Sequence, residues 1–340
     1  MAAGMPWCGE SVSPPILLRQ APMNRPSIPN PPPNSAWVLG GYLTAVFVGG
    51  ALLAPWLWMF VQHVGPHSSL AAQPFRRYVD RSLLGVALLG LWPMAKSGLF
   101  PGWHSVGMVW GRPARRDLLI GLAGGMMSLA VVALLSLGFG VRTWDSAHSW
   151  SLLLAHAIRA LGAAIAVSFM EELLFRGMVF GSLRRQFSFP AAALSSAALY
   201  ALVHFFHRPE APLSVGPWTG LEMLGRMLSG LSQPSQVFPG FLTLGAIGWL
   251  LAWCRERTGA LWVPLGLHAG WIFWFKSYTF FTAPLTHQGT QSWWWGSGRL
   301  HDGWLTFAVI AVTSAFFMGV LGRRKSPANP ANPTPLGNAP

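Results

Sequence analysis

Long apolar runs are the feature that most constrains the fold of this chain. A bilayer core about 30 Å thick is crossed by about 20 helical residues. Continuous apolar runs favour helices over barrel strands, whose apolar residues alternate with polar ones. We therefore predict an all-α fold, a polytopic transmembrane helix bundle of about eight spans. The runs lie at 37–61, 82–100, 118–140, 161–181, 189–207, 239–253, 259–275 and 303–321.

Composition supports a lipid bilayer as the environment. Hydrophobic residues make up 52% of the 340 positions and charged residues only 10%, which is more apolar than a soluble domain. The net charge of +13 comes from short basic clusters between the apolar runs. This pattern is typical of cytoplasmic loop anchors, so we expect no nucleic-acid partner. Cys8 and Cys254 are the only cysteines, so any metal ion would be held by His and Glu.

The basic clusters also indicate an orientation. If 323–325 is cytoplasmic, eight spans place the basic loops at 111–117, 182–188 and 254–258 on the same side. The cluster "RRYVDR" at 76–81 then falls outside, so either the first two spans are drawn wrongly or this segment lies along the membrane surface. We expect a multi-pass integral membrane protein of a bacterial plasma membrane, with both termini cytoplasmic.

Four ionisable positions inside the apolar runs stand out as candidates: Glu171, Glu172, His204 and His268. Such residues are costly in a membrane and usually face a cavity or one another, so function is the default hypothesis. At 1.5 Å of helical rise per residue, Glu171, His204 and His268 lie about 20, 24 and 15 Å from the cytoplasmic ends of their runs. The similar depths predict that one Glu and two His meet.

Helical spacing separates the two glutamates. Glu172 and Arg176 are four residues apart, so they share a helical face and can form a charge-assisted pair. Glu171 is rotated about 100° away from that face. It is left as a candidate general base or metal ligand.

Two kinds of chemistry fit this set of residues. Glu171, His204 and His268 can hold a divalent metal ion such as Zn²⁺, which activates a bound water. Alternatively, Glu171 and His204 activate water without metal, while His268 donates a hydrogen bond to the developing oxyanion. Both routes hydrolyse an amide bond, and the sequence leaves both open.

Three motifs resemble those of a known family. "EELLFR", which contains Glu171, Glu172 and Arg176, resembles the EExxxR motif of the CPBP intramembrane proteases. That family includes the type II CAAX prenyl endopeptidases, the Abi proteins and bacteriocin-processing proteins. "YALVH", ending at His204, resembles the family's FxxxH motif with Tyr in place of Phe, and "HAGWI", beginning at His268, resembles the third motif. The resemblance covers roughly 155–278.

The resemblance implies a role for each motif residue. Glu171 and His204 would activate the nucleophilic water, Glu172 and Arg176 would support the site, and His268 would stabilise the oxyanion or bind metal. Ile272 stands where many family members have an Asn that helps to stabilise the oxyanion. Its hydrocarbon side chain cannot donate a hydrogen bond.

The sequence thus predicts an intramembrane endopeptidase that cleaves a membrane-associated protein or peptide. Two other classes remain open: an ion- or proton-coupled transporter, in which the same residues form an ion path, and an inactive scaffold or immunity protein, which Ile272 favours.

The sequence divides the chain into five predicted parts. They are a disordered tail at 1–36, N-terminal transmembrane helices at 37–150, catalytic helices at 151–278, a Trp-rich outer loop and last helix at 279–322, and a second disordered tail at 323–340.

Overall fold

The computed structural model describes residues 35–96, 102–206, 209–229, 234–285, 293–296 and 300–323. The two tails predicted to be disordered lie outside these residues, except that the first helix already begins at Ser35 and that Arg323 caps the last helix.

The described chain is almost wholly helical, which confirms the all-α prediction. One two-stranded antiparallel sheet is present among the described residues, with Arg142 opposite Pro284. In chain order the elements are α1 (Ser35–Thr44), η1, a π-helix (Ala45–Gly49), α2 (Gly50–Val64), α3 (Phe75–Lys96), α4 (Arg112–Gly138), β1 (Arg142–Trp144), α5 (Trp150–Glu172), η2, a second π-helix (Leu173–Val179), α6 (Phe180–Arg184), α7 (Phe189–His204), α8 (Thr219–Leu228), α9 (Pro234–Thr258), α10 (Trp262–Phe281), β2 (Thr282–Pro284) and α11 (Trp304–Gly322).

Five described segments are long and apolar enough to cross a membrane, so the chain is an integral membrane protein. They are Trp37–Val64, Pro113–Gly138, Trp150–Arg184, Phe238–Thr258 and Trp304–Gly322. The remaining three predicted spans correspond to α3, α7 and α10, which form helices outside that set. Helix α7 is apolar but shorter, and the first turns of α3 carry three arginines instead of an apolar run. The predicted count of eight is therefore approximate.

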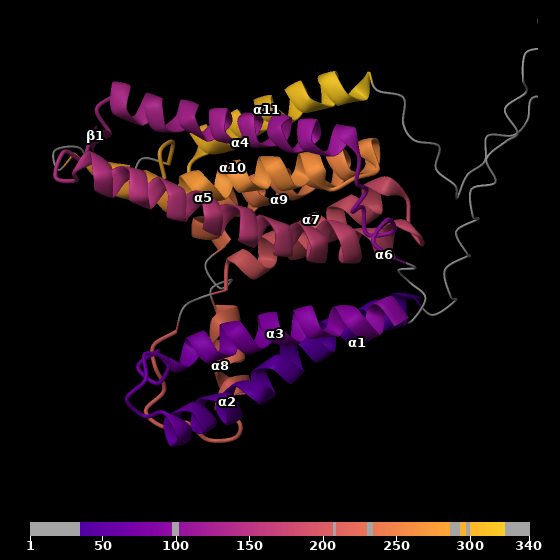
Figure 1. Cartoon of the computed structure of the whole chain (residues 1–340), viewed down its shortest axis with the longest axis vertical. Coiled ribbons are helices and arrows are strands. Elements are labelled where there is room, and N and C mark those ends of the chain that lie inside the picture. The colour runs from indigo at the N-terminus through magenta and orange to yellow at the C-terminus, as the bar shows by residue number, and fades with distance from the viewer. Residues whose placement is uncertain are drawn as a thin grey trace, which may run out of the picture.

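The helices gather into two groups, as Figure 1 shows. Helices α1, α2, α3 and α8 lie on one side, and α4, α5, α7, α9, α10 and α11 on the other. Helix α8 packs on α2 and buries Met223 and Met227 against Phe75 and Val79 of α3. Its charged residues Glu222 and Arg226 lie outside this buried cluster.

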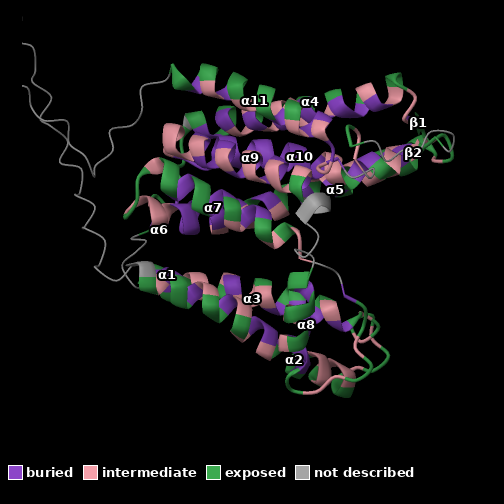
Figure 2. Cartoon of the chain, turned by 180° about the vertical axis from the view of Figure 1, so that it is seen from behind, coloured by how far each residue is buried: buried purple, intermediate pink, exposed green. Residues whose placement is uncertain are grey.

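Most helices carry both buried and exposed residues (Figure 2), and large apolar residues are among the exposed ones. Leu89 of α3, Leu134 of α4 and Phe316 of α11 are each more than 60% exposed. A soluble protein seldom exposes this much apolar surface. Outer faces of this kind suit contact with lipid.

Glycines bring α4 and α10 into backbone contact. A Cβ atom added to Gly121 would lie 2.3 Å from the Val263 carbonyl oxygen, and one added to Gly125 would lie 2.2 Å from that of Leu267. A Cβ atom added to Gly266 of α10 would likewise collide with the backbone of α4. Small residues four apart are a common means of close helix packing in membranes. This crossing fixes the position of α10, and with it His268.

Basic clusters that are far apart in sequence make contacts at the ends of the helices. Arg184 lies 2.9 Å from Glu256, Arg255 donates to the Ser105 carbonyl at 3.3 Å, and Arg257 donates to the carbonyl of Gly322. The cluster at 76–81, which the sequence treated as a loop, instead forms the first turns of α3.

Candidate active site

The "EELLFR" segment lies where α5 changes into the π-helix η2. Glu172 ends α5, Arg176 lies within η2, and both side chains are at most 1% exposed. Arg176 Nη1 donates to Glu172 Oε1 at 3.0 Å. The i and i+4 spacing thus forms the pair that the sequence predicted, and a single turn of π-helix inside a helix is frequent at functional sites.

Helix α10 presents His268 to the same carboxylate. Nδ1 of His268 lies 2.7 Å from Glu172 Oε1, and the imidazole is 4% exposed. Because Glu172 Oε1 is a carboxylate oxygen that also accepts from Arg176, Nδ1 of His268 is assigned as the donor. In the neutral imidazole, Nε2 then has only a lone pair, which faces the Tyr200 hydroxyl at 3.2 Å.

Helix α7 ends at His204, whose ring is oriented by the backbone. Nδ1 of His204 lies 2.7 Å from the Tyr200 carbonyl oxygen, which can only accept, so Nδ1 is the donor. Nε2 of His204 is therefore an acceptor, as Nε2 of His268 is. Both tautomers are assigned from these fixed partners.

Glu171 brings a third acceptor to the same point. Its Oε2 lies 3.6 Å from His268 Nε2 and 3.9 Å from His204 Nε2, which are ion-pair distances but too long for hydrogen bonds. Oε2 is buried and has no hydrogen-bond partner among the described residues. Three acceptors thus face one small space, and a water molecule has two protons to donate there.

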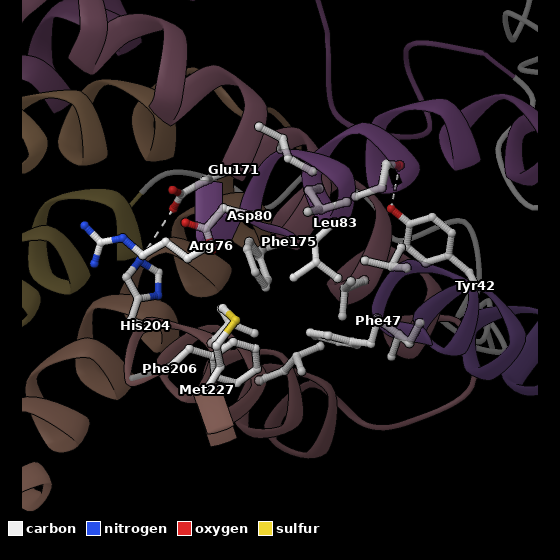
Figure 3. Close-up of a pocket in the computed structure, with 18 of the residues that line it drawn as sticks. Tyr42, Phe47, Arg76, Asp80, Leu83, Glu171, Phe175, His204, Phe206 and Met227 are labelled. Atoms are coloured by element: carbon white, nitrogen blue, oxygen red, sulfur yellow. Dashed lines mark hydrogen bonds and ion pairs between the residues drawn. The ribbon is translucent and has the colours of Figure 1, made fainter. Parts of the chain in front are cut away.

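A cavity of about 450 Å³ opens beside this space, between the two helix groups (Figure 3). Its walls are largely apolar: Tyr42 and Phe47 come from the first helical segment, Leu83 and Leu84 from α3, and Phe175 from η2.

The polar residues that line this cavity come from both helix groups. Glu171 and His204 point into it from α5 and α7, with side chains 26% and 31% exposed, and Arg76 and Asp80 come from α3 (Figure 3). The cavity therefore joins an apolar pocket to the carboxylate and imidazole of the candidate site.

One family model matches the region that contains this site. Residues 157–274 match the model of the Rce1-like type II CAAX prenyl endopeptidases, and this range contains all five predicted site residues. The chain therefore contains an Rce1-like domain. The family resemblance of the sequence motifs is confirmed over this range. No curated protein and no solved structure matches the chain.

The Rce1-like domain brings together all five residues that the sequence singled out. Glu171, His204 and His268 meet as their depths predicted, and Glu172 contacts both Arg176 and His268. Their roles in catalysis stay predictions.

A metal ion fits this arrangement poorly. No group of three or more His, Cys, Asp or Glu side chains in the described part of the chain is arranged to hold one. The Tyr200 hydroxyl occupies the lone pair of His268 Nε2 that a metal would need. The assignment of Glu171, His204 and His268 as ligands of Zn²⁺ stays a prediction, and no step below depends on it.

Two features of the domain were not foreseen. Tyr200 contacts His268, although its only sign in the sequence was a Tyr in a motif that usually has Phe. Ile272 packs in an apolar cluster with Ala160 and Ala164 of α5, so its side chain serves the contact between α10 and α5.

Proposed function

We propose that this protein is an intramembrane endopeptidase in which Glu171 and His204 activate the water that attacks a peptide bond. One observation carries the proposal: Glu171 Oε2 and the Nε2 atoms of His204 and His268 face a common space as acceptors. A water held there donates one proton to Glu171 and one to His204, which leaves an oxygen lone pair free to attack.

The chemistry needs no further reactant. The water oxygen bonds to the peptide carbonyl carbon while Glu171 or His204 takes the proton it releases, and the carbonyl oxygen becomes an oxyanion. The same proton then passes to the amide nitrogen as the carbon–nitrogen bond breaks. The products are a new carboxyl group and a new amine. The oxyanion forms beside His268, where the family resemblance assigns its stabilisation.

The buried pair supports the site. Glu172 fixes the tautomer of His268, and Arg176 neutralises Glu172 inside the protein. The two adjacent glutamates thus have different roles, since Glu171 reacts with the water and Glu172 orients the imidazole.

The cavity indicates the kind of substrate. Its apolar walls accept an apolar segment or chain, and its polar residues include the candidate dyad. We propose a membrane-associated protein or peptide whose scissile bond reaches Glu171 while an apolar portion fills the cavity. The exposed apolar outer faces keep enzyme and substrate in the same bilayer.

The proposal is tested by comparing new protein N-termini in membranes that contain wild-type protein, Glu171→Ala or His204→Ala at equal abundance. It expects cleavage products that are present with wild type and missing with each variant, mapped by mass spectrometry. If the same termini form with both variants, or if wild type forms none in membranes from its own host, the protein is not an endopeptidase of this mechanism. Proton or ion flux in vesicles with unchanged proteins would instead support a transporter.

A further inference from the structure

Tyr200 is the one phenol within hydrogen-bonding distance of the described site residues. Its hydroxyl lies 3.2 Å from His268 Nε2, and the side chain is only 2% exposed. Glu171 Oε2 lies 3.6 Å from the same nitrogen atom. The hydroxyl, the imidazole and the reactive carboxylate therefore surround a single small volume.

The hydrogen-bonding partners decide which of these groups carries a proton to give. Nδ1 of His268 donates to Glu172, so Nε2 of the neutral imidazole has none. The Nδ1 atom of His204 likewise donates to the Tyr200 carbonyl. The Tyr200 hydroxyl is thus the donor at this point, and at rest it donates to His268 Nε2.

The Tyr200 ring is held between a cation and a second aromatic ring. The Arg176 guanidinium carbon lies 4.4 Å from the ring centre, and Phe175 packs edge-on at 5.2 Å. These two contacts fix the orientation of the ring, and with it the direction of the hydroxyl.

We infer that the Tyr200 hydroxyl is the hydrogen-bond donor to the oxyanion in this site. The inference rests on the proposed function. At rest the hydroxyl proton is directed at His268 Nε2; as the carbonyl oxygen gains charge, the hydroxyl turns from the imidazole to the oxyanion. Tyr200 itself forms and breaks no covalent bond, because its O–H bond stays intact while its hydrogen bond moves from the imidazole to the oxyanion. His268 is then a positioning residue that orients the phenol. It is the third member of a hydrogen-bond chain that runs from Arg176 through Glu172 and His268 to Tyr200.

The decisive variant is Tyr200→Phe, which removes one oxygen atom and keeps the ring against Phe175 and Arg176. Tyr278→Phe is the matched control, because the Tyr278 hydroxyl is also buried and donates to Ser136 Oγ at 2.8 Å, away from the site. The probe is an internally quenched peptide that spans the cleavage site mapped with the Glu171 and His204 variants.

Tyr200→Phe is expected to lower kcat about 100-fold or more and to leave KM unchanged, because an oxyanion contact exists only in the transition state. Tyr278→Phe is expected to keep kcat within about twofold of wild type, as a residue outside the site should. An unchanged kcat for Tyr200→Phe, or a loss seen only in KM, would overturn the inference.

A second variant tests the donor directly and covers a folding defect in Tyr200→Phe. A fluorinated tyrosine at position 200 keeps the hydroxyl and makes it more acidic. The titratable groups that face it, namely Glu171, Glu172, Arg176, His204 and His268, are unchanged. The kcat of this variant should be at least that of wild type, and a kcat as low as that of Tyr200→Phe contradicts a donor role for the Tyr200 hydroxyl.

Failure of the inference can be told from failure of the proposed function. If Glu171→Ala abolishes cleavage of the probe but both Tyr200 variants match wild type, the endopeptidase stands and the oxyanion donor is another group. If Glu171→Ala cleaves the probe as wild type does, the proposed function itself fails.

Discussion

Nδ1 of His268 lies 2.7 Å from Oε1 of Glu172, and the two residues come from helices 96 positions apart in the chain. The same oxygen accepts from Arg176 at 3.0 Å. One buried carboxylate therefore joins the end of α5, the π-helix η2 and α10. The geometry of the site depends on this junction as much as on the residues that face the substrate.

Removing the Glu172 carboxylate should destabilise the fold. Glu172→Ala leaves the Arg176 charge buried without its partner, for which a loss of about 3–5 kcal/mol is typical. A titration of unfolding with SDS in mixed micelles measures the change. The matched control is Glu256→Ala, because the Glu256–Arg184 pair is more than a quarter exposed, and it should cost at most about 1 kcal/mol. Equal losses for the two variants would contradict a structural role for Glu172.

Both stability and cleavage should depend on the close packing of α4 on α10. In Gly125→Ala the new Cβ atom would lie 2.2 Å from the Leu267 carbonyl oxygen, so the helices must separate and move His268. Overpacking of this kind costs about 1–3 kcal/mol, and we expect cleavage to fall at least tenfold. Gly162→Ala on α5 is the control, since its Cβ meets nothing within 4 Å. If both variants match wild type in unfolding free energy and in cleavage rate, this crossing does not position the site.

Part of this site follows from the sequence, because helical periodicity is local. The spacing of Glu172 and Arg176 predicted their pairing, and residue counts along the spans placed Glu171, His204 and His268 at one depth. The π-helix η2 did not follow, since "LLFRGMV" carries no pattern that separates a π-turn from an α-turn.

Other contacts between distant helices could not be predicted from the sequence. The start of α3 at Phe75 was missed because Arg76, Arg77 and Arg81 interrupt its apolar pattern, and these charges suggested a loop. The same turns bring Arg76 and Asp80 to the cavity. This placement depends on how α3 packs against other helices, and no local sequence pattern encodes that packing.

Blocking the cavity should weaken substrate binding more than chemistry. Leu84 of α3 lines the cavity, and Leu84→Trp would fill part of it while leaving Glu171 in place. We expect KM for the mapped peptide to rise about tenfold with kcat within about threefold of wild type, as when only substrate binding is lost. Leu89→Trp on the same helix is the control, because Leu89 is 76% exposed on the outer face. A KM that rises equally in both variants would show that the cavity is not the substrate site.

Removal of metal ions should leave cleavage intact. The Tyr200 hydroxyl occupies His268 Nε2, and the proposed mechanism activates water with Glu171 and His204 alone. We expect protein treated with a strong chelator to keep its kcat on the mapped peptide, and elemental analysis to find less than about 0.1 zinc per chain. Loss of cleavage that Zn²⁺ restores would assign Glu171, His204 and His268 as metal ligands instead.

The most direct test of the account is the turnover of Glu171→Gln in lipid nanodiscs. Gln keeps the size of Glu171 but removes its negative charge and its capacity to take a proton. Because Oε2 has no hydrogen-bond partner among the described residues, the fold should not weaken. The account predicts that kcat falls about 1,000-fold while SDS unfolding is unchanged. A kcat within about threefold of wild type would contradict the claim that Glu171 activates the water.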